Sequence, residues 1–174
     1  GRDALGCAGP ACPRAGARVA VARSFTIEPV VPLARAAAIV HGVDMAVEIG
    51  GFNTFAQDLL DPTSFVHTQP FDVVVLAVQT RDVAPELWEF DGTAGPGDLA
   101  DVEHRVLGEL TAMVESFRAI NGAHLVVHSL ESPPRPTLGL ADPRSPIGQI
   151  AAVEHINREL RAIVERAVVG KHEF

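Results

Sequence analysis

The stretch Phe71-Asp72-Val73-Val74-Val75-Leu76-Ala77-Val78-Gln79-Thr80-Arg81-Asp82 decides the fold of this chain. Its apolar run, residues 73–78, is too short for an ordinary helix and is rich in β-branched valine. That pattern is typical of a strand buried on both faces in the middle of a parallel sheet. The polar residues that follow it lie at the carboxyl end of this strand, where open α/β sheets bind ligands. We therefore expect a central strand followed directly by a candidate site.

Strand and helix patterns alternate on both sides of this stretch. The spacing predicts strands at residues 17–23, 45–49, 73–78 and 123–128. Helical patterns follow them at residues 30–40, 55–59, 99–120 and 150–167. In the first helix the apolar spacing is Val30, Leu33, Ala37 and Val40. Residues 84–97 and 131–146 carry repeated proline or glycine and are predicted as loops, the first of them as a long loop or lid.

This alternation predicts parallel strands joined by right-handed crossovers. The expected fold is a three-layer, doubly wound α/β fold of the flavodoxin-like type, with strand order 2-1-3-4. A fifth strand would be expected after the last helix, yet Lys171-His172-Glu173-Phe174 ends the sequence. Either the sheet has four strands or the sequence stops before the fifth.

Composition excludes several classes of function. The 174 residues suit one domain, with 47% apolar residues, 21% charged residues and a formal net charge of −8. The sequence has no lysine or arginine cluster, so a nucleic-acid footprint is missing. No apolar run approaches the roughly 18 residues that a membrane span needs. Residues 1–13 lack the apolar core of a signal peptide, and we expect a cytoplasmic protein.

Residues 1–16 form a leader rich in glycine, alanine and proline, which contains Cys7 and Cys12. We interpret it as a flexible leader or an interdomain linker with two unpaired thiols; a small-loop disulfide or a metal site is the alternative. A metal site would need further ligands nearby, and the sequence offers none. The pair Gly50-Gly51 lacks the lysine or the spaced glycines of a nucleotide motif. We therefore expect neither a metal nor a cofactor.

The predicted strand order brings three segments to one crevice, since the first and third strands become neighbours. They are Ser24, Gly50-Gly51-Phe52-Asn53 and Gln79-Thr80-Arg81-Asp82. A serine at a strand-to-helix turn, with backbone N–H groups nearby, is a candidate nucleophile with an oxyanion hole. The alternative is that Ser24 and Thr26 only cap the following helix.

Two further side chains are candidates at the same edge. Arg81 ends the central strand, where a guanidinium suits a carboxylate or a phosphate, or pairs with Asp82 or Asp58. His128 leaves the fourth strand with Glu131 and is a weak candidate base, or else a half-buried histidine of the strand. The spacing of these residues does not itself make a catalytic triad.

Several short motifs follow one another along the chain and together resemble FkbH-like proteins. They are Arg18–Ser24 with Phe25-Thr26-Ile27-Glu28-Pro29, Gly51-Phe52-Asn53-Thr54-Phe55, Leu59-Leu60-Asp61-Pro62-Thr63-Ser64, Phe71-Asp72-Val73-Val74-Val75-Leu76, Glu131-Ser132-Pro133-Pro134, Ser145-Pro146-Ile147-Gly148 and Ile156-Asn157-Arg158-Glu159-Leu160. The resemblance covers nearly everything after the leader.

The resemblance implies an activity and partners. In FkbH-like proteins a domain of the SGNH-hydrolase type precedes a domain of the haloacid-dehalogenase (HAD) type. The pair loads a glyceryl unit from a phosphorylated glycerate onto an acyl carrier protein in polyketide-type pathways. The nucleophilic Asp signature of the HAD-type domain is absent from this sequence. Residues 17–174 therefore resemble the SGNH-like domain alone, and its implied partners are an acyl carrier protein and a HAD-type domain, fused or separate.

The sequence departs from the SGNH pattern at the residues that matter for hydrolysis. Ser24 falls where the nucleophile of the first block would sit, but without the usual Gly-Asp before it. Gly51 and Asn53 lie in the region of the second block, and Arg81 replaces the oxyanion asparagine of the third. The last block, which supplies an Asp and a His, falls beyond Phe174. A serine hydrolase without its base loses several orders of magnitude in rate, so ordinary esterase activity is not expected.

Three functions stay open from the sequence. The leading hypothesis is a domain that binds a small anionic acyl group or its carrier protein, with Gly51, Asn53, Arg81 and Asp82 around the ligand and Ser24 as a hydrogen-bond donor or a remnant nucleophile. The second is an active acyltransferase or esterase that uses Ser24, with His128 as its base. The third is a docking or structural domain without chemistry.

Charge also bears on the carrier protein as a partner. Carrier proteins are normally acidic, and this chain is acidic too, so contact is expected at a local basic or apolar patch around Arg135, Arg144 or the Trp88 loop.

Overall fold

The sheet has the predicted topology. The computed structural model describes residues 15–89 and 95–169. Its strands are all parallel and lie in the order β2-β1-β3-β4, which confirms the predicted α/β fold and strand order. They are β1 (Ala15–Arg23), β2 (Val43–Phe52), β3 (Val73–Ala77) and β4 (His124–Val127). The run 73–78 is the second strand from one edge, with β1 and β4 as its neighbours.

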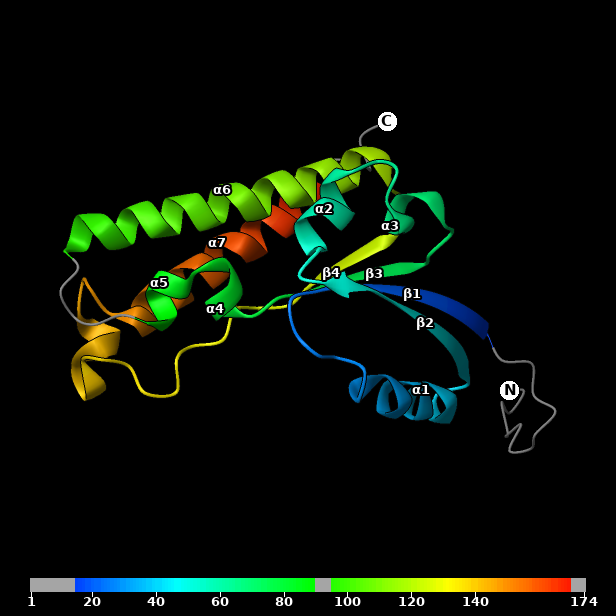
Figure 1. Cartoon of the computed structure of the whole chain (residues 1–174), viewed down its shortest axis with the longest axis horizontal. Coiled ribbons are helices and arrows are strands. Elements are labelled where there is room, and N and C mark those ends of the chain that lie inside the picture. Colours follow the sequence, from blue (N-terminus) through cyan, green and yellow to red (C-terminus); the bar gives the residue numbers. More distant parts are fainter. Residues whose placement is uncertain (1–14, 90–94, 170–174) are drawn as a thin grey trace, which may run out of the picture.

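Helices cover the two faces of the sheet unequally (Figure 1). The helices are α1 (Val30–Val40), α2 (Phe55–Leu60), α3 (Phe65–Thr68), α4 (Thr80–Val83), α5 (Pro85–Trp88), α6 (Pro96–Ile120) and α7 (Gln149–Val169), with the 3-10 turn η1 (Gly139–Arg144). α2, α6 and α7 lie on one face, and α1 lies on the other. No helix in the described ranges combines the length and the apolar character needed to cross a membrane.

The hydrophobic core lies between the sheet and the α6–α7 pair. Val74 and Leu76 of β3 point to this side and are fully buried, as are Phe117 of α6 and Ile156 of α7. Burying a side chain of this size stabilises the fold by roughly 1.5–3 kcal/mol. The long helices form because their apolar residues recur every three or four positions, and this is the signal from which they were predicted.

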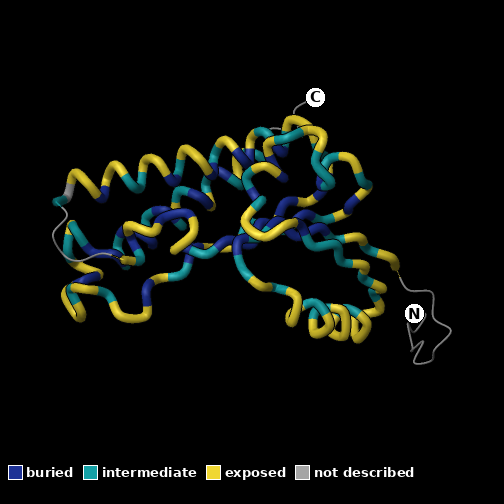
Figure 2. Tube along the Cα trace, in the orientation of Figure 1, coloured by how far each residue is buried: buried dark blue, intermediate teal, exposed yellow. Residues whose placement is uncertain are grey.

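The α1 side of the sheet is packed loosely. α1 has no buried residue, and most of its trace has the colour of exposed residues (Figure 2). Leu33 and Val40 are 71% and 82% exposed. A wholly apolar hollow of about 210 Å³ lies beneath the helix, between Val31 and Ala34 of α1 and Val75 of the sheet. Apart from Arg35, every residue of α1 is apolar, so its sequence does not distinguish an inner from an outer face.

Three local expectations differ from the structure. β2 runs on to Phe52, three residues beyond the predicted strand 45–49, so Gly50-Gly51-Phe52 is strand. The predicted loop at residues 84–97 is wrong in part, because α5 lies within it and α6 begins at Pro96; residues 90–94 lie outside the described part of the chain. β1 begins at Ala15, so the last two residues of the predicted leader belong to it, and Cys7 and Cys12 lie outside the described ranges. The helix α5 was not predicted because four residues are too few to show a periodic apolar pattern.

Candidate functional site

Ser24 joins the ends of the first and third strands. Its backbone N–H donates to the carbonyl of Ala77 at 3.0 Å, and its Oγ accepts a hydrogen bond from the backbone N–H of Gln79 at 2.9 Å. The residue is only 2% exposed. The first residue of α1 has no side-chain cap, so Ser24 and Thr26 do not cap that helix as the alternative interpretation expected. The Ser24 hydroxyl therefore holds the β3–α4 turn against β1.

Thr80 and Glu131 make a second link, across the opposite side of β3. Thr80 is fully buried, and its hydroxyl lies 2.6 Å from the backbone carbonyl of Glu131 and 3.1 Å from its Oε2. The backbone N–H of Thr80 donates to the same Oε2 at 3.1 Å. The start of α4 is thereby fixed to the segment that leaves β4.

Arg23, which the sequence reasoning passed over, is the most constrained cation at this edge. Its guanidinium forms an ion pair with Glu28 at 2.8 Å and donates to the carbonyls of Gly50 at 3.2 Å and Phe25 at 3.1 Å. Its side chain is 12% exposed. The sequence held one signal for this ion pair. Arg23 is the last residue of a predicted strand, and Glu28 follows it five residues later.

Gly51 lies near the end of β2, and Asn53 follows the strand directly. Asn53 has a φ of 57°, in the left-handed region that asparagine tolerates better than most residues, and its N–H donates to the Arg23 carbonyl at 3.1 Å. A Cβ at Gly50 would lie 2.8 Å from Oδ2 of Asp58, so this position needs glycine for close approach. Asn53 therefore makes the tight turn that leaves β2 at the carboxyl edge.

Asp58 is a buried carboxyl group behind that turn, 8% exposed. Burial raises the pKa of Asp58 above its ordinary value, and the hydrogen bond donated by the Thr54 hydroxyl at 2.8 Å offsets part of that rise. From the sequence, Asp58 was expected only as a possible partner for Arg81. In the structure its carboxyl group is bonded to Thr54 instead.

Arg81 and Asp82 are both exposed at the start of α4. The Nε of Arg81 donates to Oε1 of Gln79 at 2.8 Å. Within the described residues the arginine forms no ion pair with Asp82 or Asp58. Its terminal nitrogens are therefore available to a ligand from solvent.

His128 lies on the other side of β3 from Ser24. Its backbone N–H donates to the carbonyl of Leu76 at 2.9 Å, and its side chain is exposed. Two spacings between neighbouring strands separate the two residues, about 10 Å. In the described part of the chain no hydrogen bond joins them, so the structure does not bring the candidate nucleophile and the candidate base together. The catalytic roles of both residues stay predictions.

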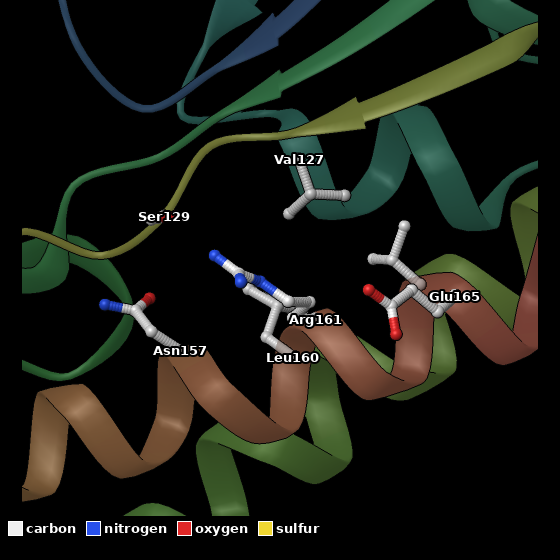
Figure 3. A pocket seen from close by; sticks show the side chains of 7 residues that line it. Val127, Ser129, Asn157, Leu160, Arg161 and Glu165 are labelled. Atoms are coloured by element: carbon white, nitrogen blue, oxygen red, sulfur yellow. The ribbon is translucent and has the colours of Figure 1, made fainter.

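A groove of about 450 Å³ lies beside β4, where sequence reasoning expected no site. Val127, Leu160 and Val164 provide its apolar part, and Ser129, Asn157 and Arg161 are at its polar end (Figure 3). Figure 3 shows the Arg161 side chain extending from α7 toward the space between Asn157 and Val127, with Glu165 away at the other end. The regular spacing of α7 identified its buried face but not that it lies beside an open sheet edge.

Residues 15–89 and 95–169 contain no group of three or more His, Cys, Asp or Glu side chains that could hold a metal ion. This part of the chain therefore offers no metal centre of that composition.

Comparison with known proteins adds one similarity in structure. No protein-family model matches the sequence, and no curated protein matches it. The fold is similar to the crystal structure of the N-terminal part of the protein BF1531 from Bacteroides fragilis, which contains a phosphatase domain complexed with Mg. The TM-score is 0.70 at 12% sequence identity, over 88% of this chain and 39% of that one. At this identity the likeness shows the fold alone, and this chain spans well under half of the other.

Proposed function

We propose that this chain is an SGNH-like domain of an FkbH-type glyceryl-loading system, and that it binds an anionic acyl group or its carrier protein instead of hydrolysing esters. The environment of the Ser24 side chain is the observation that supports binding instead of ester hydrolysis. Its hydroxyl is buried and accepts a backbone hydrogen bond, and His128 lies beyond β3. A nucleophilic serine needs a base within about 3 Å of its oxygen.

Two observations support the link to an FkbH-type system. The first is the set of motifs shared with FkbH-like proteins, and the second is the similarity in fold to the N-terminal part of BF1531. That part of BF1531 contains a phosphatase domain. The presence of a phosphatase domain in that protein is compatible with the HAD-type partner domain that the resemblance implies.

Arg81 is the proposed anion ligand. It is exposed, and among the residues that the structure describes only its Nε is bonded, while the turn that carries it is fixed by Ser24 and by Thr80. A fixed turn keeps an arginine at one place on the edge of the sheet, and a guanidinium with two available nitrogens can bind a carboxylate or a phosphate with parallel hydrogen bonds. Asp82, beside it, would disfavour a ligand with negative charge on that side.

The carrier protein itself would contact the patch around Arg135 and Arg144. Both arginines are exposed, and they lie in the segment between β4 and α7. Trp88, at the end of α5, is half-buried and could contribute apolar area there. A local basic patch is needed because the whole chain carries a formal charge of −8.

Binding of glyceryl-loaded carrier protein to wild type and to Arg81→Ala tests the proposal. We expect the variant to bind about 10-fold more weakly, because hydrogen bonds to a charged group contribute about 1.5–3 kcal/mol. Arg35→Ala is the matched control, since it removes the same charge from an exposed position on α1, on the other side of the sheet. Equal affinities for all three proteins would exclude Arg81 as the anion ligand.

A further inference from the structure

Helix α1 lies on the side of the sheet opposite α6 and α7 (Figure 1), and the strand residues beneath it line an apolar hollow. Val19 and Val21 of β1 point into this hollow, whereas Ala20 and Ala22, which alternate with them, belong to the core on the other side. Val75 of β3 also lines the hollow and is half-buried. The same strands therefore have one face in the core and another face that the helix covers incompletely.

Small side chains on the inner face of α1 leave the hollow unfilled. Val31, Ala34 and Ala38 are the half-buried residues of the helix, and their spacing of three and four places them on one face. Alanine side chains end at Cβ, so this face reaches only a short way toward the strands. The hollow that remains has a volume of about 210 Å³ and a wholly apolar lining.

Both ends of α1 are connected closely to the sheet. Arg23 follows Val21 on the same face of β1, and its guanidinium forms the 2.8 Å ion pair with Glu28, two residues before the helix. At the other end only His41 and Gly42 separate α1 from β2. These two connections set the distance of the helix from the strands, so the hollow is part of the fold.

The lining of the hollow selects an uncharged alkyl group as its ligand. An engineered apolar cavity of roughly 150 Å³ stays dry and binds benzene, so a hollow of about 210 Å³ has room for a short alkyl chain. A polar ligand would lose its hydration here without gaining a hydrogen bond. Val30, at the start of α1, lines the hollow and is 51% exposed. The hollow therefore reaches the surface beside Val30, where a polar head group can stay in water.

We propose that the hollow between α1 and the sheet is a binding site for a short alkyl chain, with the polar head of the ligand at the surface beside Val30. The inference goes beyond the proposed anion site and does not rest on it, because Arg81 does not line the hollow. A shorter chain would leave part of the hollow unfilled, and a longer one would extend into solvent.

A series of straight-chain alcohols, from pentanol to decanol, tests the proposal on the full chain. Methyl NMR of valine-labelled protein should show saturable shifts of the signals of Val19, Val21 and Val47, which line the hollow. Affinity should increase about 4-fold with each added methylene, because every methylene that leaves water contributes a similar free energy. The increase should stop before decanol, when the chain has filled the hollow.

Ala34→Leu tests where the alcohol binds. The leucine side chain should fill the hollow from α1, weaken hexanol binding about 10-fold or more, and raise the thermal midpoint of unfolding. Ala37→Leu is the matched control, since it makes the same change on the exposed side of the same helix and should leave hexanol binding unchanged. Arg81→Ala should also bind hexanol as wild type does, which separates this test from that of the proposed function.

Val47→Ala gives a second test if Ala34→Leu fails to fold. It enlarges the hollow from the side of β2, so the affinity should continue to increase for about two more carbons than in wild type. The proposal is overturned if no alcohol shifts the valine signals, if affinity does not depend on chain length, or if Ala34→Leu binds hexanol as tightly as wild type. It is also overturned if sedimentation shows a dimer that hexanol dissociates, because a second copy would then occupy the hollow.

Discussion

Replacing Thr80 by valine removes a buried hydroxyl at nearly constant volume. The hydroxyl lies 2.6 Å from the Glu131 carbonyl and 3.1 Å from its carboxylate, and the residue has no exposed surface through which water could replace these contacts. A neutral hydrogen bond contributes about 1 kcal/mol and one to a charged group about 1.5–3 kcal/mol. Thr80→Val should therefore lower the free energy of unfolding by about 2–4 kcal/mol.

Urea unfolding followed by circular dichroism measures this loss. Thr26→Val is the matched control, since Thr26 is exposed, and it should change stability by less than about 0.5 kcal/mol. A double-mutant cycle with Glu131→Ala should give a coupling energy of about 1–2 kcal/mol, because both changes remove the same contact. Additive effects, or a loss below about 1 kcal/mol for Thr80→Val, would refute the link between α4 and the segment after β4.

Three further outcomes follow from the geometry. Ser24→Ala should destabilise the fold by about 1–3 kcal/mol, measured by thermal unfolding, because it removes the acceptor of the part-buried Gln79 N–H; no change would contradict the structural role. Burial raises the pKa of Asp58 in the fold, so ionising this carboxyl group lowers the stability of the fold. This cost is absent below the ordinary pKa of 3.8 and complete above the raised pKa. The stability of wild type relative to Asp58→Asn should therefore fall as pH rises through that window, and a constant difference would refute it. Gly148→Ala should cost about 3 kcal/mol, because its Cβ would overlap the Asp142 carbonyl at the start of α7; wild-type stability would contradict this.

Parts of the fold were predictable because single segments carry a complete signal. The valine run identifies β3 as an inner strand, although Val73 and Val75 on its α1 side are only half-buried. The apolar spacing along α6 and α7 identifies the helices that cover its other face. The alternation of these patterns predicts parallel strands, and the order 2-1-3-4 is the one expected of a flavodoxin-like fold, which the structure confirms. The loose packing of α1 on the sheet could not be predicted. Nearly all of its residues are apolar, so the sequence does not show which of them are buried.

The candidate site was less predictable, since it depends on contacts between distant segments. Sequence reasoning placed Ser24 and Arg81 at one edge, which the strand order supports. It could not show that the Ser24 hydroxyl bonds to Gln79, 55 residues away. The groove at Arg161 was missed for the same reason, because only the fold sets α7 beside the open side of β4.

The most direct test of the central claim is intact-protein mass spectrometry after incubation with glyceryl-loaded carrier protein and with a generic activated ester. We expect no covalent adduct on wild type, at protein concentrations where the carrier demonstrably binds, because the Ser24 residue is buried and no base contacts its oxygen within residues 15–89 and 95–169. An acyl adduct on wild type that disappears in Ser24→Ala would contradict the account and make the chain an acyl-transferring enzyme.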